Sequence, residues 1–448
     1  MQAPLVTERD RKQSVAQENA ILVKLLDPSI QYSDDPLEEL DGLATTAGTT
    51  VVGKLTQRRD KPDPGSYLGK GKIEELTLCA EASEADVIIF DNELSPGQTR
   101  NLERETKRKV IDRTELILDI FATHAQTLES RLAVELAQLE YSLPRLKRMW
   151  SHLDRIKMGV GMRGPGEKQL EVDRRLVEKR IRDLKDDLDK VAKRREREVA
   201  ARKESMTISL VGYTNAGKST LMNSLTSAQV LSADMLFATL DTRTRRWRLP
   251  HWGPVLLSDT VGFIRDLPHR LIASFKATLE EANQADLLLH VADASNPEAE
   301  QQINAVNDVL AEIGINQKNT LLVLNKVDRI EDSGRLKQLQ ARYPYAVSVS
   351  AVSREGLDKL AIAVSDALSK SFSDVEIEAA VDNGKLVAYL AKNGEVVSKR
   401  YGNEKLFVHC RIPTAHLGRI ENQNPDAVIR PYDYTSDTEE SDTVGDVA

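Results

Sequence analysis

An eight-residue run near the middle of the chain has the residue types and spacing of a phosphate-binding loop. It fits the pattern G-x-x-x-x-G-K-[ST] and reads Gly212-Tyr213-Thr214-Asn215-Ala216-Gly217-Lys218-Ser219. The glycines let backbone N–H groups turn inward around a β-phosphate, and the dipole of a following helix adds positive potential. Lys218 would reach the β- and γ-phosphates, Ser219 would bind Mg²⁺, and Thr220 would continue the site into the helix. Alone, the motif leaves ATP and GTP open.

A second motif lies about forty residues further on. An apolar segment beginning at Val255 ends in Asp259-Thr260-Val261-Gly262. A carboxylate at the end of a strand can be linked to Mg²⁺ directly or through water, and the Gly262 N–H would meet the γ-phosphate. These four residues therefore belong to the same expected nucleotide site.

Two further strand-end motifs indicate which base is bound. The first is Asn325-Lys326-Val327-Asp328, and the second is Ser350-Ala351. The Asp328 carboxylate can accept hydrogen bonds from guanine N1–H and the 2-amino group, which adenine does not offer. A site built on such bonds can reject the wrong base by roughly 10⁴. A backbone N–H of the Ser350-Ala351 segment can read guanine O6, so the four motifs in this order predict a GTPase.

Strands and helices must bring these motifs together, and the 448 residues suffice for two to four domains. We expect a multidomain α/β protein, in which alternating strands and helices form parallel sheets. The expected parts are a flexible N-terminus over 1–17, an α/β domain over 18–115, a helical hairpin over 116–204, a P-loop GTPase domain (G domain) over 205–370, a small α+β domain over 371–433 and a disordered acidic tail over 434–448.

The hairpin is predicted from two apolar stripes. The first runs from Leu128 to Leu146 in steps of three or four residues, and the second from Leu170 to Val191. This period predicts two antiparallel helices of coiled-coil character, the first of which Pro144 should end or kink. The loop from Gly159 to Glu167 contains four glycines. A bare connector could be shorter, so we expect a binding tip.

Charge is distributed unevenly along the chain. Residues 145–204 hold 20 Lys+Arg and 12 Asp+Glu, a balance of +8, whereas the whole chain is at −8. A basic segment in an acidic protein suggests an element that faces nucleic acid. The alternative is a solvated pair of helices laced with ion pairs, and charge alone does not separate the two.

Targeting signals, membrane spans and cysteines indicate the cellular compartment of the protein. The first residues do not have the composition of a signal or transit peptide, and apolar runs stay well short of the roughly 20 residues of a membrane span. Cys79 and Cys410 have neither metal-site spacing nor a disulfide framework, so buried or idle thiols are expected. We therefore expect a cytoplasmic protein without a transmembrane segment.

The hairpin sequence also carries a resemblance. Residues 161–175, G-M-R-G-P-G-E-K-Q-L-E-V-D-R-R, resemble the signature of the HflX family of translational GTPases. Tyr67 to Lys72, Glu93 to Pro96 and Leu132 to Leu139 also resemble motifs of that family. The resemblance covers about residues 20–365. It implies an N-terminal HflX domain, the hairpin and a G domain of the Obg-like branch.

The resemblance further implies a partner and a role. The partner is the ribosome, chiefly the large subunit and its rRNA, with the hairpin loop reaching towards the peptidyl-transferase region. The implied role is to separate stalled or idle ribosomes into subunits, often under stress. Met162 stands where family members usually have a small residue, so the contacts of the tip are expected to differ in detail.

The same resemblance places a first switch at Phe237, Ala238 and Thr239, where a threonine binds Mg²⁺ and senses the γ-phosphate. Thr239 is the expected ligand, with Thr242 and Thr244 as alternatives. Phe263 follows Gly262 at the position where Ras-like enzymes place a glutamine that orients water. Phenylalanine cannot do this, so slow intrinsic hydrolysis and marked stimulation by ribosomes are expected.

Asn215 supports two interpretations. An asparagine at this place in the phosphate loop resembles GTPases that bind K⁺ between the phosphates and the first switch, where the ion replaces the charge of an arginine finger. The alternative is an asparagine that caps the loop.

Together these observations predict a Mg²⁺-dependent GTPase that binds GTP, GDP and ribosomes, does not bind DNA and acts as a monomer. Lys218, Thr239 and Gly262 are the expected catalytic groups, and Ser219, Thr239 and Asp259 the expected metal ligands. Two alternatives remain for the role, which are a GTP-dependent assembly factor for the large subunit and a nucleotide-switched regulator that binds the ribosome.

Overall fold

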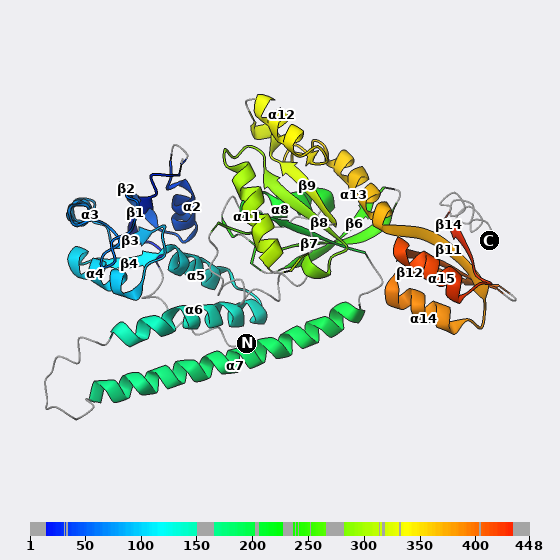
Figure 1. Cartoon of the computed structure of the whole chain (residues 1–448), viewed down its shortest axis with the longest axis horizontal. Helices are drawn as coiled ribbons and strands as arrows, with labels where there is room; N and C mark the ends of the chain where they lie inside the picture. Colours follow the sequence, from blue (N-terminus) through cyan, green and yellow to red (C-terminus); the bar gives the residue numbers. More distant parts are fainter. Residues whose placement is uncertain are drawn as a thin grey trace, which may run out of the picture.

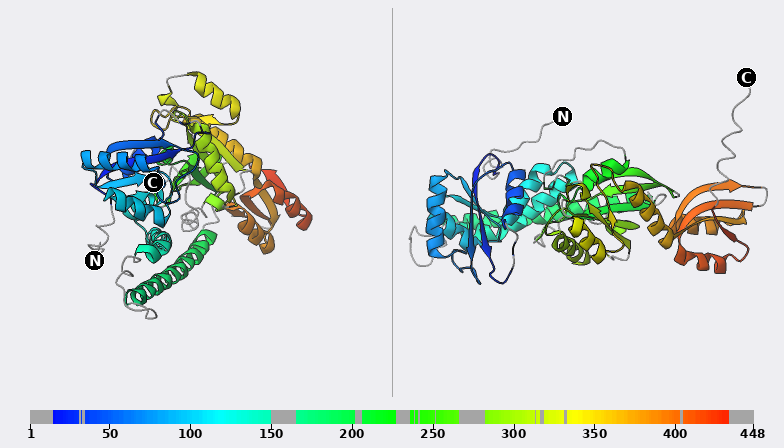
Figure 2. Two further views of the ribbon diagram at one scale, coloured as in Figure 1. Left: turned by 60° about the vertical axis from the view of Figure 1, so that its left-hand side comes forward. Right: turned by 90° about the horizontal axis from the view of Figure 1, so that it is seen from above.

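The computed structural model describes residues 15–149 except 31, 33 and 34, then 165–201, 206–226, 236–265 except 238, 241 and 251, and 282–432 except 313, 316–318, 331–332 and 403–404. Within these ranges the chain is a multidomain α/β protein with three sheets, which confirms the expected fold class. The sheets follow one another along the longest axis, and a long helical hairpin runs beside the first two (Figure 1; Figure 2).

The first sheet forms what we call the N-terminal domain. Its strands are parallel, in the order β2-β1-β3-β4, and comprise β1 (Asn19–Leu26), β2 (Thr50–Arg58), β3 (Val87–Phe90) and β4 (Lys109–Asp112). The helices between and after them are α2 (Glu38–Thr46), α3 (Lys70–Ala82), α4 (Pro96–Thr106) and α5 (Arg113–His124). Helices cover both faces of such a sheet, and accordingly every residue of β3 is buried. The sequence did not predict β4, because its four residues contain only two apolar side chains.

The hairpin consists of α6 (Leu128–Met149) and α7 (Pro165–Ala201). The two predicted stripes meet, and Leu136, Ile181 and Leu184 are buried between the helices. Leu128 is 69% exposed and does not belong to the contact. Ion pairs also lace the two helices, such as Arg180 with Glu135 at 2.7 Å. Part of the positive charge of the hairpin is therefore neutralised within it.

Two expectations for the hairpin are corrected. Pro144 does not end α6, which continues to Met149. Pro144 is exposed, so the carbonyl group four residues earlier, which loses its N–H partner, can face water. The second helix also begins earlier than predicted, because Pro165 starts α7 and the next two residues, which were expected in the tip loop, belong to its first turn. Proline at the first helical position is a start signal. Residues 150–164 lie outside the described part of the chain.

The second sheet belongs to the G domain. Its order is β10-β9-β8-β5-β7-β6, and all neighbours are parallel except β6 and β7. The strands are β5 (Thr207–Gly212), β6 (Arg243–Leu249), β7 (Gly253–Asp259), β8 (Leu287–Asp293), β9 (Thr320–Asn325) and β10 (Val347–Ser348). The helices are α8 (Lys218–Thr226), α11 (Ala299–Glu312), α12 (Ser333–Arg342), α13 (Leu357–Ser371) and the short η3 (Val327–Arg329).

The third sheet is antiparallel, with the order β12-β13-β11-β14. It contains β11 (Phe372–Ala380), β12 (Glu395–Tyr401), β13 (Lys405–Pro413) and β14 (Val428–Pro431), with α14 (Gly384–Asn393), η4 (Thr414–His416) and α15 (Leu417–Gln423). We call this the C-terminal domain. His409 is buried, with Nε2 2.7 Å from Asp374 Oδ1 and its ring stacked on Tyr432. Both contacts lie within the C-terminal domain, so this histidine has a structural environment.

One hydrophobic core runs through the N-terminal domain and the G domain without interruption. At the junction, the edge of one aromatic ring meets the face of another, with the centroids of Phe121 and Phe237 4.7 Å apart. Both cysteines are free, and burial raises the pKa of Cys410 to about 12. No helix in the described ranges is both long and apolar enough to cross a membrane. Residues 1–14 and 433–448, which include nearly all of both expected terminal tails, lie outside these ranges.

Candidate nucleotide site

The phosphate loop connects β5 to α8 at the carboxyl edge of the central sheet. Gly217 has φ +88°, and a Cβ there would lie 2.4 Å from Asn325 Nδ2. Only glycine adopts this backbone conformation at such close approach without strain. The sequence therefore places glycine where the loop passes against the base-recognition motif.

Lys218 is held inside the curve of this loop. Its side chain is buried, and Nζ donates to the carbonyl oxygens of Gly212 at 3.0 Å and Tyr213 at 2.9 Å. Burial lowers the pKa of Lys218 to about 8, and the nearby Asp259 charge opposes this effect only in part. Phosphate groups in the loop would supply the negative charge that favours the ammonium form.

Three side-chain oxygens converge next to Lys218. Ser219 Oγ lies 2.7 Å from Thr239 Oγ1 and 2.6 Å from Asp259 Oδ2, and Thr239 Oγ1 lies 3.2 Å from the same carboxylate oxygen. Of the two alternatives for the switch threonine, Thr244 contacts Ser258 on β7 instead, at 3.0 Å. Thr239 is thus the threonine that the fold brings to the other two oxygens.

The Asp259 carboxylate fits a bound cation. Burial raises its pKa, while Lys218, Ser219 and Thr239 lower it. Its Oδ1 atom is buried and has no hydrogen-bond partner among the described residues. A buried carboxylate oxygen without a partner is costly, and Mg²⁺ prefers such oxygen ligands. The three oxygens are therefore suited to Mg²⁺.

Gly262 lies against the phosphate loop. A Cβ there would be 2.8 Å from Thr214 Cα and 3.1 Å from Lys218 Nζ, so a side chain would collide with the loop. The next residue pairs with the loop through its backbone. Thr214 N–H donates to Phe263 O at 2.6 Å, and Phe263 N–H donates to Gly212 O at 3.1 Å. The Phe263 ring is buried, so it leaves no water-orienting group after Gly262.

The base motif divides into a supporting part and an exposed part. Asn325 Nδ2 donates to Ala216 O at 2.9 Å, and Asn325 Oδ1 accepts from Ala351 N–H at 3.1 Å. Asn325 thus ties the phosphate loop to the Ser350-Ala351 segment. Asp328, in contrast, is exposed in η3. Because Ala351 N–H already has an acceptor, reading guanine O6 would require it to be shared between two.

Comparison with known proteins adds to this geometry. Residues 34–122 match the family described as GTP-binding GTPase N-terminal, residues 124–202 the GTP-binding GTPase Middle Region, and residues 207–326 the 50S ribosome-binding GTPase. The GTPase HflX of Magnetococcus marinus is 44% identical over 427 residues, covering 93% of this chain and 99% of that protein. The GTPase HflX of Escherichia coli is 43% identical over 92% of this chain and 97% of its own length. The chain belongs to the HflX family of GTPases.

One of the solved structures that match this chain is that of a GTP-binding protein from Sulfolobus solfataricus in complex with GDP. It is 25% identical, covers 79% of this chain and 99% of its own, and has a TM-score of 0.43. As an HflX GTPase, the chain binds GTP and GDP, hydrolyses GTP and belongs to a ribosome-binding family.

Several expected site residues of this HflX GTPase have partners inside the protein. Thr260 Oγ1 donates to Leu210 O at 2.7 Å, Thr214 Oγ1 accepts from Phe237 N–H at 2.8 Å, and Lys326 pairs with Asp293 at 2.8 Å. Val261 and Phe237 are buried, whereas Val327 is half-buried beside Asp328. These residues therefore support the site through contacts within the protein. Ala238 lies outside the described residues.

Sequence reasoning missed some residues around the HflX site. Asp293 pairs with Lys326 and is the last residue of the apolar strand β8, so its strand-end position was a usable signal. Glu39, Arg113 and Arg265 contact one another and the phosphate loop. They carry no local signal, because Glu39 is separated from the loop residue it contacts by 174 positions.

Proposed function

We propose that this HflX GTPase binds the large ribosomal subunit and its rRNA and separates stalled or idle ribosomes into subunits under stress. The observation that carries the proposal is the link between α7 and the nucleotide site. This helix begins within the family signature and ends at Ala201, five positions before Met206, from which β5 leads directly into the phosphate loop. One long helix thus spans most of the sequence between the expected tip and the nucleotide site.

Charge near the tip supports an RNA partner. Residues 145–169 hold seven Lys+Arg and two Asp+Glu, whereas residues 170–204 hold thirteen and ten. Most of the excess positive charge therefore lies towards the tip, and the ion pairs described above lie along the paired helices. Such charge would neutralise rRNA phosphates and make binding weaken as salt rises.

The proposed roles in the nucleotide site follow the contacts. The phosphates would occupy the loop 212–219 and continue to Thr220, with Lys218 on the β- and γ-phosphates and the Gly262 N–H on the γ-phosphate. Ser219, Thr239 and Asp259 would hold Mg²⁺, directly or through water. When bound, Mg²⁺ neutralises charge that develops on the phosphate oxygens. Asp328 would select guanine.

The segment 259–265, which we call the second switch, supports control of hydrolysis by the partner. Phe263 is buried and cannot orient water, so the chain alone is expected to hydrolyse GTP slowly. Contact with the ribosome would complete the site. GTP would license docking and separation, and hydrolysis would release the protein for another round.

A K⁺ ion is proposed beside Asn215. Its side chain is exposed, its φ is +58°, and it makes no hydrogen bond within the described residues. The alternative of a loop cap therefore has no contact to support it. Replacing K⁺ with Na⁺ at constant ionic strength should slow hydrolysis, and an unchanged rate would refute the proposal.

We further propose that the protein acts as a cytoplasmic monomer, which light scattering after gel filtration would check.

The decisive experiment measures GTP turnover with and without purified ribosomes while subunit separation is followed in the same samples on sucrose gradients. Strong stimulation together with separation supports the proposal. Equal turnover in both samples contradicts it. A non-hydrolysable GTP analogue separates two forms of the role, because full splitting without hydrolysis would assign hydrolysis to recycling alone.

The alternative functions share the same contacts and predict different outcomes. A large-subunit assembly factor predicts immature subunits in cells that lack the protein. A nucleotide-switched regulator predicts binding and stimulated turnover without separation of subunits. The splitting function is favoured here because it uses both the nucleotide site and the long helix that connects it to the tip.

A further inference from the structure

The N-terminal domain contacts the nucleotide site through one acidic residue. Glu39 of α2 accepts a hydrogen bond from the Tyr213 hydroxyl of the phosphate loop at 2.5 Å. Its second oxygen accepts from Arg265 Nη2 at 3.2 Å. Arg265 lies three residues after Gly262, so a single carboxylate joins the phosphate loop to the end of the second switch.

Arg113 of α5 supports this carboxylate from within the N-terminal domain. One of its nitrogens lies 2.9 Å from Glu39 Oε1 and donates to the carbonyl of Arg265 at 3.2 Å, while the other pairs with Asp91 at 2.7 Å. Its side chain is 6% exposed. Burial alone would lower the pKa of Arg113, but the charges of Glu39 and Asp91 raise it above its usual range. The guanidinium therefore stays charged.

Tyr213 connects the two sides of the contact. Its hydroxyl accepts from the Arg265 N–H at 2.8 Å while it donates to Glu39. The backbone of the next loop residue, Thr214, is bonded to Phe263 O. The segment 263–265 is thus held by the main chain of the phosphate loop at one end, and by Tyr213, Glu39 and Arg113 at the other.

The first switch rests on the same domain. Phe237 packs edge-on against Phe121 of α5, and the Leu236 N–H donates to Thr46 Oγ1 of α2 at 3.2 Å. Thr239 lies two residues further along the chain. Both segments that carry the expected γ-phosphate contacts therefore have supports in α2 and α5.

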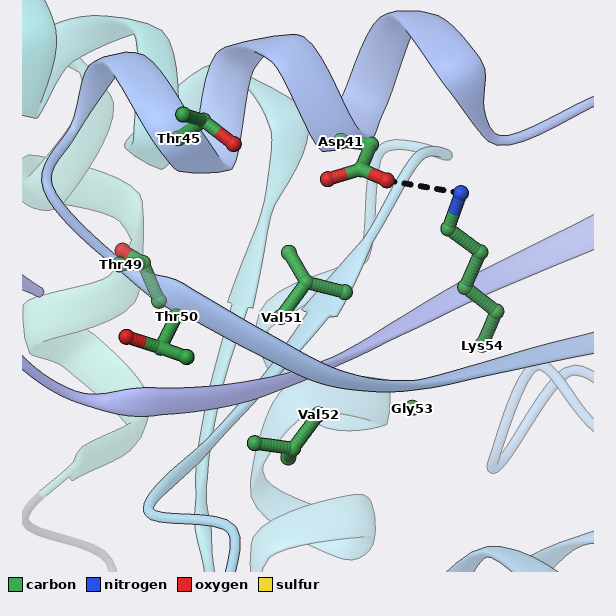
Figure 3. A pocket seen from close by; sticks show the side chains of 8 residues that line it. All are labelled: Asp41, Thr45, Thr49, Thr50, Val51, Val52, Gly53 and Lys54. Carbon is green, nitrogen blue, oxygen red and sulfur yellow. Dashed lines mark ion pairs between the residues drawn. The ribbon is translucent and has the colours of Figure 1, made fainter.

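The helix that carries Glu39 is itself fixed to its sheet. Leu40 and Leu43 are buried in the core, and Asp41 pairs with Lys54 of β2 at 2.7 Å across a hollow between α2 and β2 (Figure 3). Lys54 also pairs with Asp35 at 2.6 Å. A displacement of Glu39 relative to the G domain would therefore involve the N-terminal domain and not one side chain.

We propose that Glu39 is a positioning residue for the nucleotide site. Together with Arg113 it holds Tyr213 and Arg265 so that Gly262 and Thr239 can face the γ-phosphate, and the inference rests on the roles proposed above for those two residues. Linkage makes the effect reciprocal. A contact that favours GTP over GDP is itself favoured when GTP is bound. The contact between the N-terminal domain and the G domain therefore depends on which nucleotide is bound.

The test measures the affinities of fluorescent GDP and a fluorescent non-hydrolysable GTP analogue, with Mg²⁺, on the full chain. Glu39→Gln removes the charge at nearly constant volume, and Tyr213→Phe removes only the hydroxyl. Each change should shift the ratio of the two affinities against the GTP analogue by about tenfold. The double variant should shift it no further than the stronger single variant, because both changes break one connection.

Two matched variants serve as controls. Glu38→Gln changes the neighbouring carboxylate, which is exposed on the same helix, and Tyr345→Phe changes a tyrosine that is 90% exposed. Both should keep the wild-type ratio. A ratio that stays at the wild-type value in Tyr213→Phe and Glu39→Gln, or shifts towards GTP, overturns the inference even if the melting temperature falls, because a purely structural contact would lower stability alone. Should Glu39→Gln fail to fold, Tyr213→Phe decides by itself.

The proposed function is tested separately in the same assay. Thr239→Ala should weaken binding of the GTP analogue more than that of GDP. If it does not, the proposed role of the first switch fails. If it does, while Tyr213→Phe and Glu39→Gln behave as the wild type, only the role of Glu39 fails.

Discussion

The side chain proposed to select the base is one that the fold leaves exposed. Asp328 lies in η3, directly after β9, while Asn325 of the same motif is turned inward to join two loops. The motif therefore combines an internal brace with a free carboxylate. That division explains why the two residues should respond differently to substitution, since loss of Asn325 would disturb the phosphate loop and loss of Asp328 would not.

We predict that Asp328→Asn moves the preference from guanine to xanthine nucleotides. The amide cannot accept both guanine N–H groups, so GDP affinity should fall by at least about a hundredfold, whereas XDP should gain. Competition between GDP and XDP for a fluorescent nucleotide measures this. Asp382→Asn, at an exposed turn of the C-terminal domain, is the matched control. Retained guanine preference in Asp328→Asn would contradict the assignment.

We predict that Lys218 makes nucleotide binding depend on pH. Its pKa is lowered to about 8 by burial, and bound phosphates would raise it, so binding takes up a proton when the pH exceeds that value. Affinity should fall as pH rises, by about fourfold between pH 7 and 8.5. Calorimetric titration with GDP at pH 8.5, in buffers of different ionisation enthalpy, measures the proton uptake. Binding without uptake would show that the lysine is already fully charged.

At the residue scale, motif spacing was enough to find the phosphate loop and the base motif, and the family resemblance selected Thr239 over its two neighbours. These groups lie within a few residues of a strand end, so a short stretch of sequence contains both the strand pattern and the residues that would do the chemistry. Glu39 and Arg113 could not be found in this way. Their contacts with Tyr213 and Arg265 join helices of one domain to loops of another. Hydrophobic periodicity in the sequence cannot predict contacts of this kind.

At the scale of single elements, α6 shows how a helix tolerates a residue that should break it. Apolar periodicity predicted both helices of the hairpin, because the stripe on each one packs against the other. Their ends were less well predicted. Proline was expected to end or kink the helix at position 144, where α6 continues to Met149, and it was overlooked as a start at position 165. The same residue type has opposite meanings in these two settings.

We predict that Pro144→Ala stabilises the hairpin. Alanine restores one backbone hydrogen bond and removes the clash of the proline ring, effects worth up to about 3 kcal/mol in a helix interior. The free energy of unfolding should rise by about 1–2 kcal/mol, since neighbouring contacts already hold α6 in shape. Urea unfolding followed by circular dichroism measures it. A loss of stability would mean that the proline is required by the local geometry.

At the scale of the whole molecule, buried charge joins the C-terminal domain to the G domain. Arg411 of β13 is 3% exposed and lies 3.3 Å from Asp374 and 3.4 Å from Glu395. It also donates to the carbonyl of Trp252 in the β6–β7 turn and lies over its ring, 5.1 Å from the centroid. The sequence predicted a small α+β domain here, but not this docking, which depends on residues 159 positions apart.

Removing this guanidinium should uncouple the domain. We predict that Arg411→Met costs about 3–5 kcal/mol, because two buried carboxylates lose their cation. Arg400→Met, which removes an exposed arginine from the neighbouring strand β12, should cost less than about 1 kcal/mol. Urea unfolding followed by the fluorescence of the buried Trp247 and Trp252 compares the two variants. Similar losses of unfolding free energy in the two variants would show that burial does not determine how much this charge contributes to stability.

The length of α7 has a mechanical consequence. Its 37 residues make a rod of about 55 Å, one end of which lies six positions before the strand that leads into the phosphate loop. A rotation of about 5° at that end would sweep the other end through about 5 Å, close to the pitch of one helical turn. If the helix turns as one body about its end nearest the nucleotide site, adjustments too small to alter the fold around the site become displacements of several ångströms at its other end.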